Sequence, residues 1–234
     1  MSGHTEHAFE TAIEAGLTCS GGYAARSPNA YDEAIALFPD DVSGFLKDSQ
    51  SAKWEALEAL LGPKTTSTVL DNLSKELEVK GTLHILRHGF KCYGKTLRMA
   101  YFRPNTTMNP EAVENYAKNR LTITRQVAFT SVMKKADGNN RRCIIDVTLA
   151  VNGIPVVTSE LKNPLTGQRA ADAIRQYEHE RDGRDLLFAF KQRALAHFAV
   201  DPDEVWMTTR LRGNETQFLP VNRGNHHGAG NPPV

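Results

Sequence analysis

Three charged residues in two neighbouring β-rich segments have the types and the spacing needed for metal-dependent hydrolysis. Asp146 interrupts the apolar segment RRCIIDVTLAV (141–151), and Glu160 and Lys162 interrupt PVVTSELKN (155–163). An ionised carboxylate inside an apolar strand is costly unless it is paired or bound to a metal. The i, i+2 spacing of Glu160 and Lys162 puts both side chains on one face of a strand. The sequence therefore predicts a place where two carboxylates and one ammonium group meet.

The chemistry of this group is that of phosphodiester hydrolysis. Two hard carboxylates suit Mg²⁺, with Mn²⁺ as a substitute, and leave positions for water and a phosphate oxygen. The metal lowers the pKa of its bound water and offsets charge that develops on the phosphorane. Lys162 would orient or deprotonate the attacking water, or hold the phosphate. From the residues alone, the alternative is a buried Lys–Glu ion pair with an incidental aspartate.

The two segments flank Asn152-Gly153, a pair that predicts a β-hairpin. A strict two-residue loop would pair Asp146 with the residue before Glu160 and turn Glu160 away. One extra residue, in a three-residue loop or a β-bulge, would pair Asp146 with Glu160 instead. We predict that extra residue, because Gly153 and the proline at position 155 favour irregular pairing.

Further residues are candidates to complete this site. Glu10 and Glu14 lie one helical turn apart on the first expected helix, and Glu10 is predicted as a third metal ligand. Gln126, on the strand before the hairpin, is expected to line the same cleft. Basic residues near the hairpin's outer turn and two residues on the following helix are predicted to contact DNA: Lys134, Lys135, Arg141, Arg142, Gln176 and Tyr177. Each has an ordinary alternative, namely a solvated helix face, a solvated loop or, for Tyr177, the core.

The elements that must position these residues follow an α/β or α+β order. Ser51 is expected to cap a helix that Gly62-Pro63 ends. The other expected helices are 7–15, 66–80 and 167–181, and the expected strands are 121–130, 141–151, 155–163 and 205–209.

A second motif competes with this interpretation. GFKCYGKT (89–96) satisfies the phosphate-loop pattern G-x-x-x-x-G-K-[ST] and would make the chain an ATPase with Lys95 on the phosphates. Such a loop needs a helix directly after its Lys-Thr pair. The continuation LRMAYFRPN instead predicts a strand that soon reaches Pro104. The context therefore disfavours the ATPase.

The composition and charge of the chain limit the class of protein to which it can belong. The chain has 234 residues, of which 40% are hydrophobic and 24% charged, as in an ordinary globular protein with a real core. The formal net charge of +1 neither indicates nor excludes a nucleic-acid binder, because a local basic face would serve. Three separated cysteines suit a reducing cytoplasm and lack zinc-ligand spacing. We expect neither a membrane span nor a secretory signal.

Longer strings carry a resemblance to a known family. They are HAFETAIEAGL, YFRPN, NRLTITRQV, VNGIPVVTSELKNPLTGQ, DAIRQYEHERD, HFAVDPDEVWMTTRL, FLPVNRG and GAGNPP. Over nearly its whole length the chain resembles the N-terminal nuclease region of the restriction (motor and nuclease) subunit of type I restriction–modification enzymes.

The resemblance implies a mixed α/β fold of the PD-(D/E)xK nuclease kind, with a central mixed sheet flanked by helices and extra N-terminal helices. It matches Asp146, Glu160 and Lys162 to the metal-binding acids and the lysine, and Glu10 to an acid of the first helix. It implies Mg²⁺-dependent cleavage of double-stranded DNA by a type I site-specific deoxyribonuclease in a bacterial or archaeal cytoplasm. The implied partners are DNA and the modification (methyltransferase) and specificity subunits, with no membrane.

The resemblance also sets the expected organisation. Residues 1–220 would form a single nuclease domain with a helical elaboration at about 31–80, and 221–234 would link it to an ATP-dependent motor region. ATP would act only through that region, beyond residue 234. Related nucleases carry Gln-x-x-x-Tyr after the lysine, whereas here Ala173 stands four before Tyr177 and the glutamine is Gln176. The alternatives are the phosphate-loop ATPase and a non-catalytic module that docks on DNA or another subunit.

Overall fold

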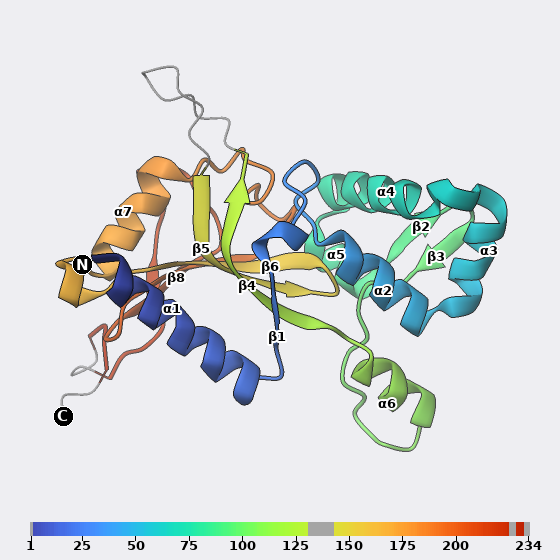
Figure 1. The fold of residues 1–234 in the computed structure, drawn as a ribbon, viewed down its shortest axis with the longest axis horizontal. Helices are drawn as coiled ribbons and strands as arrows, with labels where there is room; N and C mark the ends of the chain where they lie inside the picture. Colours follow the sequence, from blue (N-terminus) through green and yellow to red (C-terminus); the bar gives the residue numbers. More distant parts are fainter. Residues whose placement is uncertain (1, 131–142, 225–227, 232–234) are drawn as a thin grey trace.

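A mixed β-sheet forms the centre of the molecule (Figure 1). The computed structural model describes residues 2–130, 143–224 and 228–231. Within these residues seven strands form the main sheet, in the order β1-β4-β5-β6-β7-β8-β9. Strands β1 and β4 are parallel, as are β6 and β7, and the other neighbours are antiparallel. The strand bounds are Ala24–Arg26 (β1), Leu121–Phe129 (β4), Cys143–Val151 (β5), Ile154–Leu161 (β6), Ala196–Val200 (β7), Val205–Thr208 (β8) and Leu219–Pro220 (β9).

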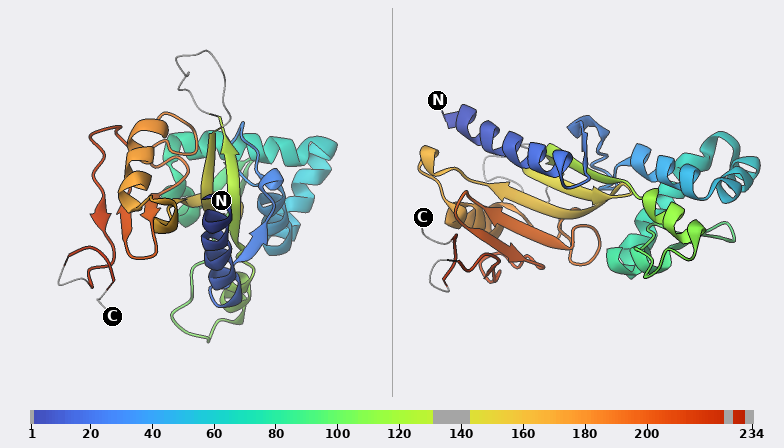
Figure 2. Two further views of the ribbon diagram at one scale, coloured as in Figure 1. Left: turned by 60° about the vertical axis from the view of Figure 1, so that its left-hand side comes forward. Right: turned by 90° about the horizontal axis from the view of Figure 1, so that it is seen from below.

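Two helices cover opposite faces of this sheet (Figure 2). Helix α1 (Ser2–Cys19) packs an apolar stripe that includes Phe9 and Ile13 against Ile123 and its neighbours in the sheet. Helix α7 (Ala170–Glu180) buries Tyr177 in a second cluster on the other face. The expected α/β class, with a central mixed sheet flanked by helices, is confirmed.

The start of α7 is fixed by a residue from the far end of β7. Asp201 is buried, and its Oδ2 accepts a hydrogen bond from the Ala170 N–H at 2.8 Å. A free N–H at a helix start needs such an acceptor, and a carboxylate also suits the positive end of the helix dipole. This contact sets where α7 begins relative to β7, and β7 lies beside β6.

A helical subdomain extends from one end of the sheet. It contains helices α2 to α5 and a small hairpin, with the bounds Pro39–Ser49 (α2), Ser51–Leu61 (α3), Thr65–Lys80 (α4), Thr82–His88 (α5), Phe90–Cys92 (β2) and Lys95–Leu97 (β3). Helix α6 (Pro110–Ala117) follows, and the single-turn 3₁₀ helices are Pro28–Ala30 (η1), Gly62–Lys64 (η2) and Pro164–Thr166 (η3). Residues such as Phe45, Leu73 and Ile85 form the core of the helical subdomain, which also includes Ile154 of β6.

The β5–β6 turn is buried against this subdomain. Asn152 is fully buried, and its side chain accepts from the Arg120 N–H at 2.6 Å and donates to the Met99 carbonyl at 2.8 Å. The Gly153 carbonyl accepts from the Phe38 N–H at 2.9 Å. The predicted hairpin is confirmed, and its turn joins the sheet to the helical subdomain.

The phosphate-loop alternative is wrong, because the Lys-Thr pair lies in a strand. Strands β2 and β3 form an antiparallel hairpin in which Cys92 pairs with Lys95. Tyr93 and Gly94, between them, have positive φ angles, as a tight turn requires. The next helix, α6, begins only at Pro110, so no helix N-terminus directly after Lys95 offers a phosphate cradle.

Other predicted elements are present with shifted ends. The first helix is longer than 7–15, and the helix expected at 167–181 spans Ala170–Glu180. Ser51 is the first residue of α3, and Gln50 occupies the cap position expected for the serine. Among the described residues, no helix combines the length and apolar character needed to cross a bilayer.

The division predicted at residue 220 stays a prediction. In the structure the Val221 N–H donates to the Val205 carbonyl at 2.7 Å, and the Asn222 side chain donates to the Asp203 carbonyl at 2.8 Å. The beginning of the segment predicted as a linker thus contacts the turn between β7 and β8 and the first residue of β8.

Candidate active site

The register of the β5–β6 hairpin brings the two predicted acids to facing positions. Val151 pairs with Ile154 across the turn, whereas Val147 pairs with Ser159. The shift between these pairs is a bulge next to Leu149/Ala150 that adds one residue on β6. Continued by one position, the register puts Asp146 opposite Glu160. The predicted extra residue is confirmed.

A third polar residue faces Asp146 from the other neighbouring strand. The β4–β5 ladder pairs Arg125 with Val147 and Val127 with Ile145. The position between them, Gln126 opposite Asp146, is left out of the ladder because Gln126 has a φ of 54°. Gln126, Asp146 and Glu160 therefore form a row across β4, β5 and β6.

Both oxygens of Asp146 are oriented by these neighbours. The Leu161 N–H on β6 donates to Asp146 Oδ2 at 2.8 Å. The Gln126 side-chain amide lies at 3.5 Å from Oδ1, a long and weak hydrogen bond. Asp146 is half-buried, so it remains partly accessible to solvent.

Glu160 is fully buried and is held from one side by Arg181, the residue that ends α7. The Arg181 Nε and Nη2 atoms each lie 2.7 Å from Glu160 Oε1, and Nη2 also donates to the Ile144 carbonyl at 3.0 Å. Burial and the charge of Asp146 raise the pKa of Glu160 to about 8, although Arg181 and Lys162 oppose this rise. Sequence analysis missed Arg181, because its pairing depends on where α7 ends.

Lys162 follows directly after β6 and shares the neighbourhood of Glu160. Its N–H donates to the Val200 carbonyl at 2.8 Å, which continues the pairing of β6 with β7. The side chain is half-buried, and its charge acts on the Glu160 carboxyl. The structure thus brings together the three residues predicted as catalytic.

Glu10 approaches the same place from α1. It is almost fully buried, its Oε2 accepts from Arg125 Nε at 3.0 Å, and its Oε1 accepts from Gln126 Nε2 at 2.7 Å. Burial raises the pKa of Glu10, and the charge of Asp146 adds to the rise. Glu14 lies farther out, with Oε2 at 3.7 Å from Arg125 Nη1. The structure brings Glu10 near Asp146, and its role as a direct metal ligand stays a prediction.

The residues predicted to contact DNA have different outcomes. Lys134, Lys135, Arg141 and Arg142 lie outside the described residues. Gln176 is half-buried on α7, and its contact with DNA stays a prediction. Tyr177 is fully buried, and its hydroxyl lies 3.0 Å from Thr158 Oγ1. Its ring packs against Phe188 and His197, so its expected contact with DNA is corrected to a core role.

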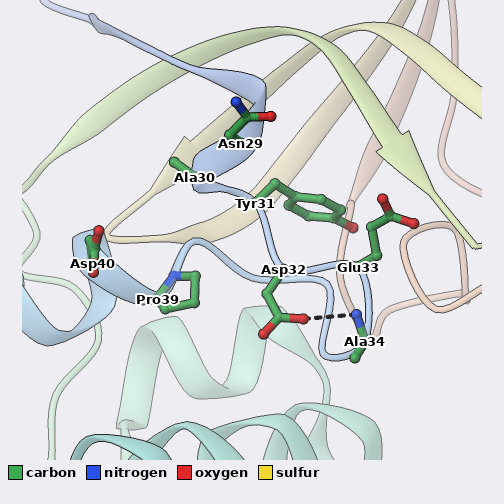
Figure 3. Close-up of a pocket in the computed structure, with 8 residues that line it drawn as sticks. All are labelled: Asn29, Ala30, Tyr31, Asp32, Glu33, Ala34, Pro39 and Asp40. Carbon is green, nitrogen blue, oxygen red and sulfur yellow. Dashed lines mark hydrogen bonds between the residues drawn. The ribbon is translucent and has the colours of Figure 1, made fainter.

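A surface hollow near η1 is a separate feature (Figure 3). Its lining includes Asp32, Glu33 and Asp40 and no lysine or arginine. The Asp32 carboxylate accepts a hydrogen bond from the Ala34 N–H at 2.9 Å. Three carboxylates would repel the negatively charged phosphates of DNA, so this hollow is not the candidate active site.

One observation indicates that Asp146 and Glu160 are suited to bind a hard divalent cation. Glu160 Oε2 is buried and has no hydrogen-bond partner among the described residues. An unsatisfied buried oxygen is costly, and a cation would satisfy it. The described residues contain no preformed group of three or more His, Cys, Asp or Glu side chains around one metal position. Two acids are sufficient for Mg²⁺, which usually takes one or two carboxylates and keeps several waters.

The sheet and its two covering helices form a mixed α/β core that is compatible with a nuclease. Residues 95–216, more than half of the 234-residue chain, match the family described as type I restriction enzyme R protein N terminus. The chain belongs to this family, and the resemblance inferred from sequence is confirmed. The match includes Asp146, Glu160 and Lys162 but not Glu10. No curated protein matches the sequence.

Proposed function

We propose that this chain is the endonuclease region of a type I restriction enzyme, and that it hydrolyses phosphodiester bonds of double-stranded DNA with Mg²⁺. The observation that carries the proposal is the facing position of Asp146 and Glu160, with Lys162 two residues farther along. Membership of the type I R protein family supports the same activity.

In this proposal Asp146 and Glu160 hold the metal. Asp146 offers Oδ1, because Oδ2 already accepts the Leu161 N–H. Glu160 offers Oε2, because Oε1 is held by Arg181. Bound Mg²⁺ would lower the pKa of a coordinated water and offset negative charge on the phosphate.

The protein's own groups complete the chemistry. The Lys162 side chain, beside Glu160, orients the attacking water or holds the scissile phosphate as an ammonium group, or receives the proton of the water as a neutral amine. Arg181 keeps the Glu160 carboxylate in place and offsets its charge. The Gln126 side-chain amide lies between the carboxylates of Glu10 and Asp146, so it links Glu10 to the site.

The larger assembly is also part of the proposal. The chain would act beside an ATP-dependent motor region and with modification and specificity subunits. We propose that target recognition lies in another subunit, because the sequence has no helix rich in Arg, Asn and Gln that would enter a DNA groove. Sequence-selective cleavage by the purified chain would contradict this part.

The first experiment is calorimetric titration of Mn²⁺ or Mg²⁺ into the wild type and into Asp146→Ala. Binding that disappears in the variant supports a metal site at the hairpin, and equal binding in both would remove Asp146 as a ligand. Cleavage is then measured on supercoiled plasmid with Lys162→Ala as the catalytic variant. A non-catalytic docking module would bind DNA equally in both forms and cut in neither.

A further inference from the structure

Gln126 has a backbone conformation that a strand residue rarely adopts. It lies in the middle of β4, yet its φ is 54°. Side chains other than glycine are disfavoured there, because Cβ approaches the neighbouring carbonyl oxygen. The ladder continues on both sides, from Arg125–Val147 to Val127–Ile145, so the irregularity is local. It falls opposite Asp146.

Packing does not explain why a glutamine stands at this position. The Gln126 side chain is exposed, so it fills no space in the core. Glycine would adopt the same φ without strain, and asparagine would tolerate it better than glutamine. Non-glycine residues held in strained conformations are found preferentially at functional sites.

The strained conformation brings one amide group to two carboxylates from different elements. Gln126 Nε2 lies 2.7 Å from Glu10 Oε1 on α1 and 3.5 Å from Asp146 Oδ1 on β5. An amide nitrogen carries two N–H groups, so it can donate to both acids at once. It carries no charge, and therefore leaves the negative charge of both acids available to a cation.

We propose that Gln126 is a positioning residue, whose side-chain amide fixes Asp146 Oδ1 and Glu10 relative to each other for metal binding. The inference rests on the proposed function and adds to it a specific residue and a specific contact. Groups that orient metal ligands typically change metal affinity about 10- to 100-fold when they are removed. Gln126 would therefore stabilise the metal-bound state while its backbone conformation weakens the fold.

Two variants separate this role from a structural one. Gln126→Gly removes the amide and suits the backbone, and Gln126→Asn keeps an amide that is one methylene too short to reach both acids. We expect both to unfold at urea concentrations equal to or above that of the wild type. We expect both to bind Mn²⁺ at least about tenfold more weakly in calorimetry at one fixed pH.

Tyr93→Gly is the matched control. Tyr93 also has a positive φ, of 44°, but it is an exposed turn residue between β2 and β3 in the helical subdomain. This variant makes the same backbone change away from Asp146, so it should leave Mn²⁺ affinity unchanged.

The outcomes distinguish the inference from the proposed function. If the Gln126 variants bind Mn²⁺ as the wild type does while Asp146→Ala binds none, the inference is overturned and the metal site stands. Clear destabilisation of Gln126→Gly would also overturn it, because the residue would then be structural. If the wild type binds no Mn²⁺, both the proposed function and the inference are overturned.

Discussion

Arg181 contacts one carboxylate oxygen of Glu160, and the other oxygen has no hydrogen-bond partner among the described residues. Its Nε and Nη2 atoms each lie 2.7 Å from Oε1, whereas no donor in the described part of the chain reaches the buried Oε2. Both side chains are almost completely buried, so neither charge is solvated by water. The pair therefore fixes the carboxylate and aims its second oxygen in one direction.

Removing Arg181 should destabilise the fold. In Arg181→Met the Glu160 carboxyl loses the charge that opposes the rise of its pKa, so at neutral pH it stays buried in its protonated form. Glu160 Oε1 and the Ile144 carbonyl also lose their hydrogen-bond donor, and an unsatisfied buried acceptor typically costs about 1–3 kcal/mol. We expect a loss of about 1–3 kcal/mol in the free energy of unfolding, measured by urea denaturation.

The double variant Arg181→Met/Glu160→Gln is the control for this prediction. Removing both charges avoids the unpaired group, so its loss should be smaller than the sum of the two single losses. Additive losses would show that the two side chains are not energetically coupled, in conflict with their contact.

Lys162→Ala should separate catalysis from folding. The Lys162 side chain is half-buried, and its backbone N–H, which pairs with Val200, is kept in alanine. We expect plasmid cleavage to fall by about 100-fold or more, since a group that assists proton transfer or stabilises developing charge contributes that much. The urea midpoint and the Mn²⁺ affinity should change little.

Lys162→Arg is the matched variant for this measurement. It keeps a positive charge, but its guanidinium stays protonated at neutral pH and cannot accept a proton, so a phosphate-binding role would be partly retained and a base role would be lost. Cleavage by Lys162→Ala at the wild-type rate would remove Lys162 from the mechanism.

The facing position of Asp146 and Glu160 is predictable from sequence, because the position of the turn and the number of extra residues beside it determine which residues of the two strands pair. Asn152-Gly153 locates the turn, and Gly153 and Pro155 favour the irregular pairing that supplies one extra residue. The structure has that residue as a bulge on β6. Local sequence therefore contains enough information for the hairpin and for the pair of acids.

Residues that act through tertiary contacts are not predictable in this way. Arg181 reaches Glu160 only because α7 ends beside β6, and the start of α7 is set by Asp201 from beyond β7. The positive φ of Gln126 has no local cause in the sequence, since the residues around it favour a regular strand. Tyr177 looks like a cleft residue by motif, but its hydroxyl is satisfied inside the core by Thr158.

His197 should make the fold sensitive to acid. It is buried on β7, with Nδ1 at 2.8 Å from Thr158 Oγ1, and burial lowers its pKa to about 3. Between pH 6.5 and 3 the unfolded chain binds a proton at this residue and the folded chain does not. Its stabilising contribution is therefore complete above about pH 6.5 and is lost as the pH falls, by on the order of 1 kcal/mol per unit.

The comparison with His197→Gln isolates this effect from that of the carboxylates. Urea denaturation at several pH values should show the wild type losing stability faster than the variant between pH 6.5 and 4. The same substitution at exposed His179 on α7 tests whether loss of any histidine has this result. A stability difference between wild type and His197→Gln that stays constant with pH would contradict the prediction.

The turn that precedes the acid on β6 should tolerate no side chain at Gly153. Its φ is 82°, and a Cβ there would lie 2.5 Å from Val42 Cγ2 and 2.6 Å from the Phe38 carbonyl oxygen. Gly153→Ala must therefore push the hairpin away from the helical subdomain. Gly94→Ala is the matched control, since Gly94 has a φ of 73° and nothing within 4 Å of the added Cβ.

We expect a loss in the free energy of unfolding of about 1 kcal/mol for Gly94→Ala, from backbone strain alone, and at least about 2 kcal/mol for Gly153→Ala. Equal losses in urea denaturation would mean that the turn is not held by this contact. A larger loss at Gly153, together with weaker Mn²⁺ binding, would mean that docking of the turn also maintains the register that pairs Asp146 with Glu160.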